Sequence, residues 1–265
     1  MENNVTVENW EHLQKIIFED SFNTSIGRFR SNFVFRGLSN KDYDLKPSIN
    51  RVCGNNHLNL ENNLIRNFKK YLNTNYINRE NFWELIALAQ HHGLPTRLLD
   101  WTFSPIVAVH FATEDFSQYN ADGIIWCLNA VKLREFLPVN LKRILTSENA
   151  FFFSAEMLND YKNFNAFENE DFFFLYEPPS IDDRIINQYA LFSVASKAKL
   201  ILNDWLVQYP DLYKLIIIPK ENKLEIRDKL DQMNMTERII YPGLDGLCKW
   251  LSRHYTPTEI IKAKV

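Results

Sequence analysis

Residues 90–105 read QHHGLPTRLLDWTFSP, a stretch that changes from one type of secondary structure to another within a few residues. Apolar side chains over 82–91 predict a helix, and Gly93 and Pro95 end it because neither residue continues a helix readily. The next residues, 97–101, predict a strand. The stretch also collects two histidines, an arginine, an aspartate, a tryptophan and several hydroxyls, a mixture more typical of a polar ligand site than of a core.

The same stretch opens a further helix. Ser104 is a suitable N-cap, and Pro105 follows at the first helical position, where proline is tolerated. Pro47 argues against a helix, so 46–49 is expected to be a loop. By the same patterns, helices are expected over 59–71, 226–233 and 244–254, and strands over 32–37, 123–128, 186–194 and 215–219.

The composition allows a sizeable core and indicates no polyanionic partner. Of 265 residues, 46% are hydrophobic, and 20 Phe, 11 Tyr and 6 Trp supply much buried area. The 30 basic and 33 acidic residues give a net charge of -3, so nucleic acid and anionic lipid are not indicated as partners.

Cysteine usage and the start of the chain predict a cytoplasmic protein. Cys53, Cys127 and Cys248 are far apart and odd in number, which supports neither a disulfide framework nor a zinc site. The first residues lack the basic and apolar segments of a signal peptide. Apolar runs fall well short of the roughly 20 residues that span a bilayer, so no membrane partner is expected.

The organisation along the chain favours one domain over 1–265. No repeat, low-complexity tract or linker divides it. Residues 1–32 are interpreted as a helical lead-in. Residues 130–180 are rich in Asn, Asp, Glu and Phe, and we interpret them as an irregular insertion or a mobile region.

Several short motifs occur in a fixed order. Together they resemble the FRG domain, a bacterial family named after its Phe-Arg-Gly motif. The resemblance runs from about Phe33 to Trp250 and rests on these segments: Phe35-Arg36-Gly37, 92–102, Ser104-Pro105 with Ala108 and Phe111-Ala112, Arg184-Ile185 with Gln188 and Leu191-Phe192, and 241–246.

A weaker resemblance is to ADP-ribosyltransferases. Phe35-Arg36-Gly37 is similar to the first strand of the arginine-type enzymes. Residues 99–108 are similar to a strand and serine-initiated helix of poly(ADP-ribose) polymerases, and 187–192 to their Asn-Glu-Tyr strand. Gln188 stands where the glutamate belongs. This resemblance implies an α+β fold, a single mixed domain with a split-sheet core and surrounding helices, and NAD as the cofactor or a related nucleotide as the small-molecule partner.

The resemblance also implies roles for individual residues. Arg36 would pair with a phosphate, because a guanidinium is a rigid fork of donors. Gly37 would let the backbone approach the ligand. Thr102 and Ser104 would bond a ribose or the nicotinamide amide. The catalytic set is therefore Arg36, Gln188 and Ser104, and the ligand-binding set is Gly37, His92, Arg97, Asp100, Trp101, Thr102, Arg184 and Tyr189.

Gln188 leaves the activity open. Tyr189 or Trp101 could stack on nicotinamide, but the amide of Gln188 supplies no negative charge to an oxocarbenium-like transition state. If the chain is an enzyme, ADP-ribosyl transfer or NAD glycohydrolysis is the implied reaction, in a bacterial toxin or phage-defence effector. The alternative is a non-catalytic recognition or regulatory module for a nucleotide-like or phosphorylated ligand or a protein partner.

Structural interpretations compete with these roles. Arg36 can pair with Asp100 or Asp245 and tie strands together. His91 and His92 suit the end of a helix, where a cationic imidazole complements the dipole. No His-Glu-x-x-His or similar spacing occurs, so no metal site is predicted.

Overall fold

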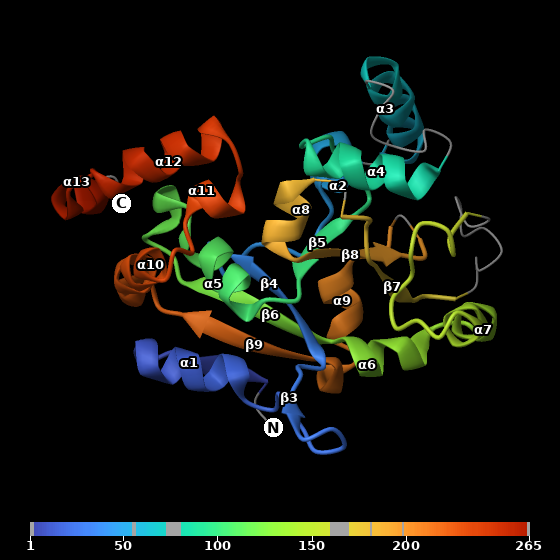
Figure 1. The fold of residues 1–265 in the computed structure, drawn as a ribbon, viewed down its shortest axis with the longest axis horizontal. Coiled ribbons are helices and arrows are strands. Elements are labelled where there is room, and N and C mark those ends of the chain that lie inside the picture. Colours follow the sequence, from blue (N-terminus) through green and yellow to red (C-terminus); the bar gives the residue numbers. More distant parts are fainter. Residues whose placement is uncertain are drawn as a thin grey trace.

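The centre of the molecule is a seven-stranded mixed sheet in the order β1-β9-β6-β4-β5-β8-β7 (Figure 1). The computed structural model describes residues 3–54, 57–72, 81–159, 170–180, 182–197 and 199–263. Within these, β1 runs parallel to β9 and the other neighbouring strands are antiparallel. The strands are β1 (Asn4–Thr6), β4 (Phe33–Leu38), β5 (Leu99–Thr102), β6 (Gly123–Asn129), β7 (Phe173–Tyr176), β8 (Ala190–Ala195) and β9 (Tyr213–Ile218), and β2 (Phe22–Asn23) pairs separately with β3 (Arg28–Phe29).

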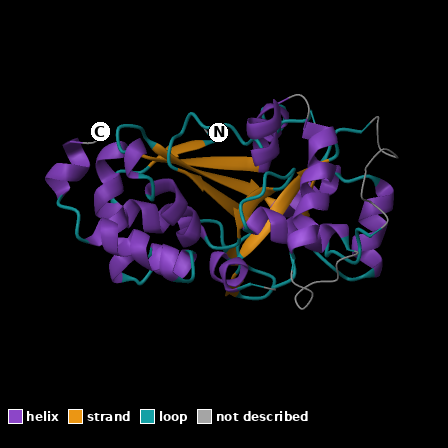
Figure 2. Ribbon diagram, turned by 90° about the horizontal axis from the view of Figure 1, so that it is seen from above, coloured by secondary structure: helices purple, strands orange, loops and turns teal. Residues whose placement is uncertain are grey.

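Helices gather in two groups with the strands between them (Figure 2). Within the described residues, none combines the length and the apolar character that crossing a membrane requires. The helices are α1 (Trp10–Phe18), α2 (Ser48–Cys53), α3 (His57–Tyr71), α4 (Phe82–His91), α5 (Pro105–Thr113), α6 (Ala130–Leu133), α7 (Val139–Ser147), α8 (Asp183–Gln188), α9 (Leu202–Leu206), α10 (Lys223–Gln232), α11 (Glu237–Ile240), α12 (Leu244–His254) and α13 (Thr258–Ala263).

The stretch 90–105 folds as its pattern predicts. Helix α4 ends at His91, and Gly93 takes the left-handed φ of 84°. Ser104 accepts a hydrogen bond from the Val107 backbone N–H at 3.3 Å and caps α5. The strand between them, β5, begins at Leu99, two residues later than expected.

The interpretation of residues 1–32 as a helical lead-in is only partly correct. Helix α1 is present, but the chain begins with β1, and the pair β2–β3 follows the helix. Strand β1 has three residues and pairs with β9, more than two hundred residues along the chain. A strand this short, paired at such a distance, leaves no local periodicity to read.

The expectation of irregular structure over 130–180 is only partly correct for the described residues, and 160–169 lie outside them. Helices α6 and α7 occur here, and β7 is an edge strand of the central sheet. Phe153 and Phe174 are each 1% exposed, so the phenylalanines of this region supply core.

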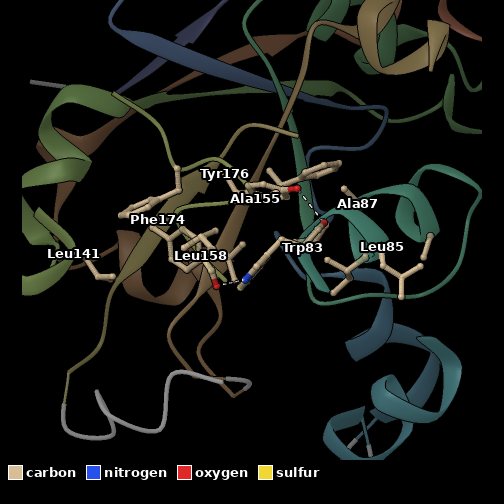
Figure 3. Packing of buried hydrophobic residues seen from close by; sticks show 14 of the residues in the cluster. Trp83, Leu85, Ala87, Leu141, Ala155, Leu158, Phe174 and Tyr176 are labelled. Carbon is tan, nitrogen blue, oxygen red and sulfur yellow. Dashed lines mark hydrogen bonds between the residues drawn. The ribbon is translucent and has the colours of Figure 1, made fainter. Parts of the chain in front are cut away.

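One of the three hydrophobic clusters of the core surrounds Trp83 of α4 (Figure 3). Its indole Nε1 donates to the Leu158 carbonyl at 2.9 Å, and the Tyr176 hydroxyl donates to the Trp83 carbonyl at 3.0 Å. The rings of Phe174 and Tyr176 meet the indole edge to face. Each buried polar atom of the indole and phenol thus has a partner, which burial of such groups requires.

Two further expectations on secondary structure are wrong. Residues 46–49 are not all loop, because Pro47 is the N-cap of α2 and Ser48 begins the helix. Residues 186–194 are not one strand. Helix α8 covers the first three of them, Tyr189 ends the helix in a left-handed conformation, and β8 follows.

Candidate functional site

The strands β4 and β5 diverge near the middle of the sheet. Strand β4 pairs with β6 over its whole length, but within the described structure it pairs with β5 only at Phe35 and Thr102. Beyond this pair, Arg36 takes up the contact between the two strands. Its Nη1 donates to the Asp100 carbonyl at 2.6 Å and lies 3.7 Å from Oδ2 of the same residue.

Arg36 is an incompletely paired cation. Its side chain is 14% exposed, and its buried Nε has no hydrogen-bond partner in the described part of the chain. Burial lowers the pKa of Arg36 below its ordinary value; the Asp100 carboxylate opposes this change, and the neighbouring Arg51 adds to it. Since the Asp100 side chain is 52% exposed, water screens the negative charge that faces Arg36.

A chain of hydrogen bonds holds Asp100 in place. Gln90 Nε2 donates to Asp100 Oδ2 at 2.9 Å, and Thr96 Oγ1 donates to Gln90 Oε1 at 2.7 Å. The Thr96 backbone N–H donates in turn to Ser48 Oγ at 3.2 Å. These hydrogen bonds connect α2, α4 and β5 near Arg36, so the polar groups beside the guanidinium are held in place.

The sequence patterns did not identify four of the residues around Arg36 and Asp100. Gln90 and Thr96 stand inside the quoted stretch, where a polar residue at the end of an apolar helix was a usable signal. Ser48 and Arg51 lie on α2, which was expected to begin as a loop. Their proximity to Arg36 depends on how α2 packs, which no local pattern encodes.

Gly37 has a packing role that its sequence context did not reveal. A Cβ placed on it would lie 1.8 Å from the Ala108 carbonyl oxygen, so α5 crosses β4 at van der Waals contact with the strand backbone (Figure 1). The close approach expected at Gly37 is therefore made by a helix. Its contact with a ligand stays a prediction.

The residues at the end of β5 and just after it mostly form contacts within the fold. Trp101 is 3% exposed and its Nε1 donates to Ser193 Oγ at 2.9 Å, so its ring is not free to stack on a ligand. Thr102 Oγ1 donates to the Gln188 carbonyl at 2.7 Å and accepts from the Ser104 N–H at 3.0 Å. Thr102, Ser104 and Gln188 thus meet where β5 ends.

The side chain of Gln188 reaches a different element from the one expected. It lies at the end of α8, and its Nε2 donates to the Ile240 carbonyl of α11 at 3.1 Å. The neighbouring Asn187 amide donates to the Ile239 carbonyl at 2.8 Å. Both amides therefore fasten α8 to α11.

Tyr189 is the exposed aromatic residue of the candidate site. Its φ of 48° is strained for a residue with a side chain, at a cost of about 1–2 kcal/mol. The residue is 58% exposed, and its ring lies 4.8 Å from that of Phe103. Of the two rings expected to stack on a ligand, only that of Tyr189 faces solvent.

Arg97 is bound within the protein. Its backbone N–H donates to Glu61 Oε1 at 2.8 Å and its Nε to Oε2 at 2.5 Å. Glu61 is 2% exposed, so this pair joins α3 to the segment before β5. A charge-assisted pair of this kind leaves Arg97 little capacity for a ligand anion.

Arg184 joins the start of α8 to the end of α4. Its Nη1 donates to the His91 carbonyl at 3.0 Å, and His91 Nε2 lies 2.9 Å from Asp182 Oδ1. Burial lowers the pKa of His91 despite the Asp182 carboxylate beside it. His92 is the exposed C-cap of α4, as the helix-end interpretation expected.

The structure thus brings the expected residues together in two small groups. Arg36 and Asp100 form one, and Thr102, Ser104 and Gln188 form the other. Across the described ranges, no set of three or more His, Cys, Asp or Glu side chains is placed to hold a metal ion.

Comparison with known proteins yields one match. Neither the curated proteins nor the solved structures include one that matches this chain. A family model does match, that of the FRG domain, over residues 31–121. The matched segment runs from the approach to β4 through α5 and contains Arg36, Asp100 and the whole of the stretch 90–105. Over residues 31–121, about a third of its length, the chain therefore matches the FRG domain family.

Proposed function

We propose that the chain binds a nucleotide-like, phosphate-bearing ligand where β4 and β5 diverge, with NAD as the first candidate. The observation that carries the proposal is the state of Arg36. It is a buried guanidinium with a free Nε, a second arginine nearby and one half-exposed carboxylate as counter-charge. A bound phosphate would supply the missing negative charge and acceptors.

The base of such a ligand has a candidate platform in Tyr189 and Phe103. Both rings lie beside the ends of β5 and α8, and the strained backbone of Tyr189 holds its ring outward. Stacking on an aromatic face tolerates any base, because every base has a π-face. The proposal therefore names a ligand class that combines phosphate and an aromatic ring.

Recognition without catalysis is the better supported form of this function. An ADP-ribosyltransferase or NAD glycohydrolase needs negative charge near the developing cation, and Gln188 supplies none. Its amide is also engaged by the Ile240 carbonyl. ADP-ribosyl transfer, and with it a role as a toxin or phage-defence effector, stays a prediction from family resemblance.

Calorimetric titration with NAD, ADP-ribose and ATP tests the proposal. We expect micromolar binding of at least one of the three, and a loss of tenfold or more in Arg36→Met. Arg143→Met, an exposed arginine on α7, is the matched control and should bind like the wild type. Equal affinity of both variants, or no binding by a well-folded wild type, refutes the proposal.

Incubation with NAD separates the two forms of the function. A recognition module leaves NAD intact at stoichiometric protein, and Gln188→Glu does not change this. Release of nicotinamide by the wild type, lost in Arg36→Met, would instead establish the enzyme.

A further inference from the structure

A second site lies away from Arg36, between the end of α5 and the helices α11 and α12. A groove of about 650 Å³ opens there, lined among others by Glu114, Asp115, Tyr241, Cys248 and Lys249. Figure 1 shows α11 and α12 beside the segment that follows α5. Three carboxylates and two cations line the groove, so its charge is slightly negative.

Two of these charged groups, Glu237 and Arg253, form an ion pair. Arg253 donates to Glu237 and to Asp231, each through two hydrogen bonds. Asp115 accepts from the Ser117 N–H at 2.9 Å and from its hydroxyl at 2.7 Å. Within the described residues, neither Asp115 nor Glu114 has a lysine or arginine nitrogen within 4.0 Å, and of the two Glu114 is the less exposed.

Glu114 stands where helix electrostatics disfavour a carboxylate. It is the C-cap of α5, next to the negative end of the helix dipole. Its side chain is 26% exposed, so water compensates it only in part. No lysine or arginine among the described residues compensates the unfavourable charge, and positions that break a local rule in this way are where function is expected.

A buried histidine points at the same carboxylate. His110 is 0% exposed, and its Nδ1 lies 2.9 Å from Arg227 Nη2. Since a guanidinium can only donate, Nδ1 accepts and the ring proton is on Nε2. That nitrogen lies 3.3 Å from Glu114 Oε2, outside hydrogen-bond geometry, and has no other partner in the described structure. Burial lowers the pKa of His110, so the imidazole is neutral and does not balance the carboxylate.

The motif over 241–246 explains how Tyr241 reaches Glu114. Gly243 adopts a φ of 99°, and a Cβ on Gly246 would lie 1.8 Å from the Tyr241 carbonyl oxygen. Only glycines allow this tight turn before α12. The turn places the Tyr241 hydroxyl 3.1 Å and 2.9 Å from the two oxygens of Glu114, to which it donates.

The groove already accommodates an ammonium group. Lys249 Nζ lies 4.7 Å from the centre of the Tyr241 ring, a cation–π distance. Within the described residues, no carboxylate oxygen lies within 4.0 Å of this nitrogen. A cation is therefore stable over the ring, while the carboxylate behind it has none.

We propose that this groove binds a ligand that carries a primary ammonium group, with Glu114 as its counter-ion. The Tyr241 hydroxyl lies at similar distances from both oxygens, so it occupies the side on which a planar guanidinium would form its two parallel bonds. An ammonium group is compact and its three donors rotate freely, so it can bind through a single lone pair of the Glu114 carboxylate on the side away from Tyr241. The ammonium can come from a free diamine or from a lysine side chain of a protein.

Titration of isotope-labelled protein with 1,5-diaminopentane and with a short lysine-containing peptide tests the site and distinguishes the two sources. We expect millimolar or tighter binding, with shifts of the backbone amides of Glu114 and Tyr241. A response to the diamine alone indicates a free amine, and a tighter response to the peptide indicates a protein lysine. Agmatine, in which a guanidinium replaces one of the two ammonium groups, should bind no better than the diamine.

Variants decide whether Glu114 is responsible. Glu114→Gln should weaken binding tenfold or more and melt like the wild type, whereas Glu148→Gln, the same change at the exposed C-cap of α7, should bind normally. Lys249→Met should tighten binding two- to fivefold, because it removes a competing positive charge. Equal weakening by both glutamine variants, tighter agmatine binding, or weaker binding in Lys249→Met overturns the proposal.

Discussion

Two buried arginines of this chain have opposite surroundings. Arg253 of α12 is 8% exposed and donates to both oxygens of Glu237 and of Asp231 at 2.5–2.8 Å. Burial acts to lower its pKa, but these carboxylates outweigh the burial and raise the pKa above the ordinary value. Arg36 has one carbonyl, one distant carboxylate and a pKa that burial lowers.

This difference distinguishes Arg253, which stabilises the fold, from Arg36, which is a candidate ligand-binding group. A guanidinium in which every nitrogen already donates to a carboxylate, as at Arg253, has little capacity left for a ligand. A guanidinium with an unpaired Nε, as at Arg36, can still donate one charge-assisted hydrogen bond to a ligand. Three substitutions test this distinction.

Arg253→Met should have the largest effect on stability. It would leave Glu237, 5% exposed, and Asp231 without their main partner, and an unpaired buried carboxylate is costly. We expect the free energy of unfolding to fall by about 3–5 kcal/mol. Chemical denaturation measures this value, and a loss below about 1 kcal/mol would remove the contrast with Arg36.

Lys223 is expected to have an effect between those of Arg253 and Arg36, and the effect can be measured from how stability depends on pH. It is 0% exposed, and burial lowers its pKa to about 8 from 10.5. Between these values the unfolded chain holds a proton that the folded chain has lost, so stability rises with pH. Relative to Lys223→Met, the wild type should gain about 1–3 kcal/mol between pH 8 and pH 10.5.

Paired denaturation curves at the two pH values give this difference. The donor bonds from Lys223 Nζ to the Ser39 and Gln118 carbonyls oppose the loss of the proton and limit the gain. A difference that falls as pH rises would show that the ammonium is stabilised in the fold, as Arg253 is.

Arg36→Met should have the smallest effect on stability. Methionine fills a similar volume, and Asp100 keeps its bond from Gln90 and its exposure to water. We expect a change within about 1 kcal/mol, measured by thermal and chemical denaturation. If the free energy of unfolding falls by about 3 kcal/mol, or if the variant is insoluble, Arg36 stabilises the fold and the binding proposal is wrong.

Local signals were sufficient for much of the fold. Helices α4 and α5 were predicted because capping residues and helix breakers act within one turn of the chain. Strands β6 and β9 were predicted because continuous apolar runs are long enough to recognise. Helix α8 was missed because its ends depend on an Asp182 cap and on a left-handed Tyr189, which an apolar alternation conceals.

The sequence indicated which residues could form the candidate site, but not which groups each of them contacts in the fold. The sequence indicated Arg36 and Asp100, and the structure connects them, through a backbone carbonyl that no side-chain pattern could name. Arg97 and Trp101 resembled ligand residues because sequence does not show whether Glu61 and Ser193 already bind them. Glu114 was not singled out, since its contact with Tyr241 becomes visible only in the folded structure.

The parallel pairing of β1 with β9 has a consequence for the order of assembly. Asn4–Thr6 leaves the ribosome before its partner Leu215–Ile217, which follows roughly 210 residues later. At about 5–20 residues per second, the first strand waits on the order of 10–40 s for the last strand of the sheet. Until β9 is made, β6 lacks its neighbour on that side of the sheet and has an open edge, where chains can associate wrongly. Pairing of β1 with β9 therefore completes this side of the sheet only late in synthesis.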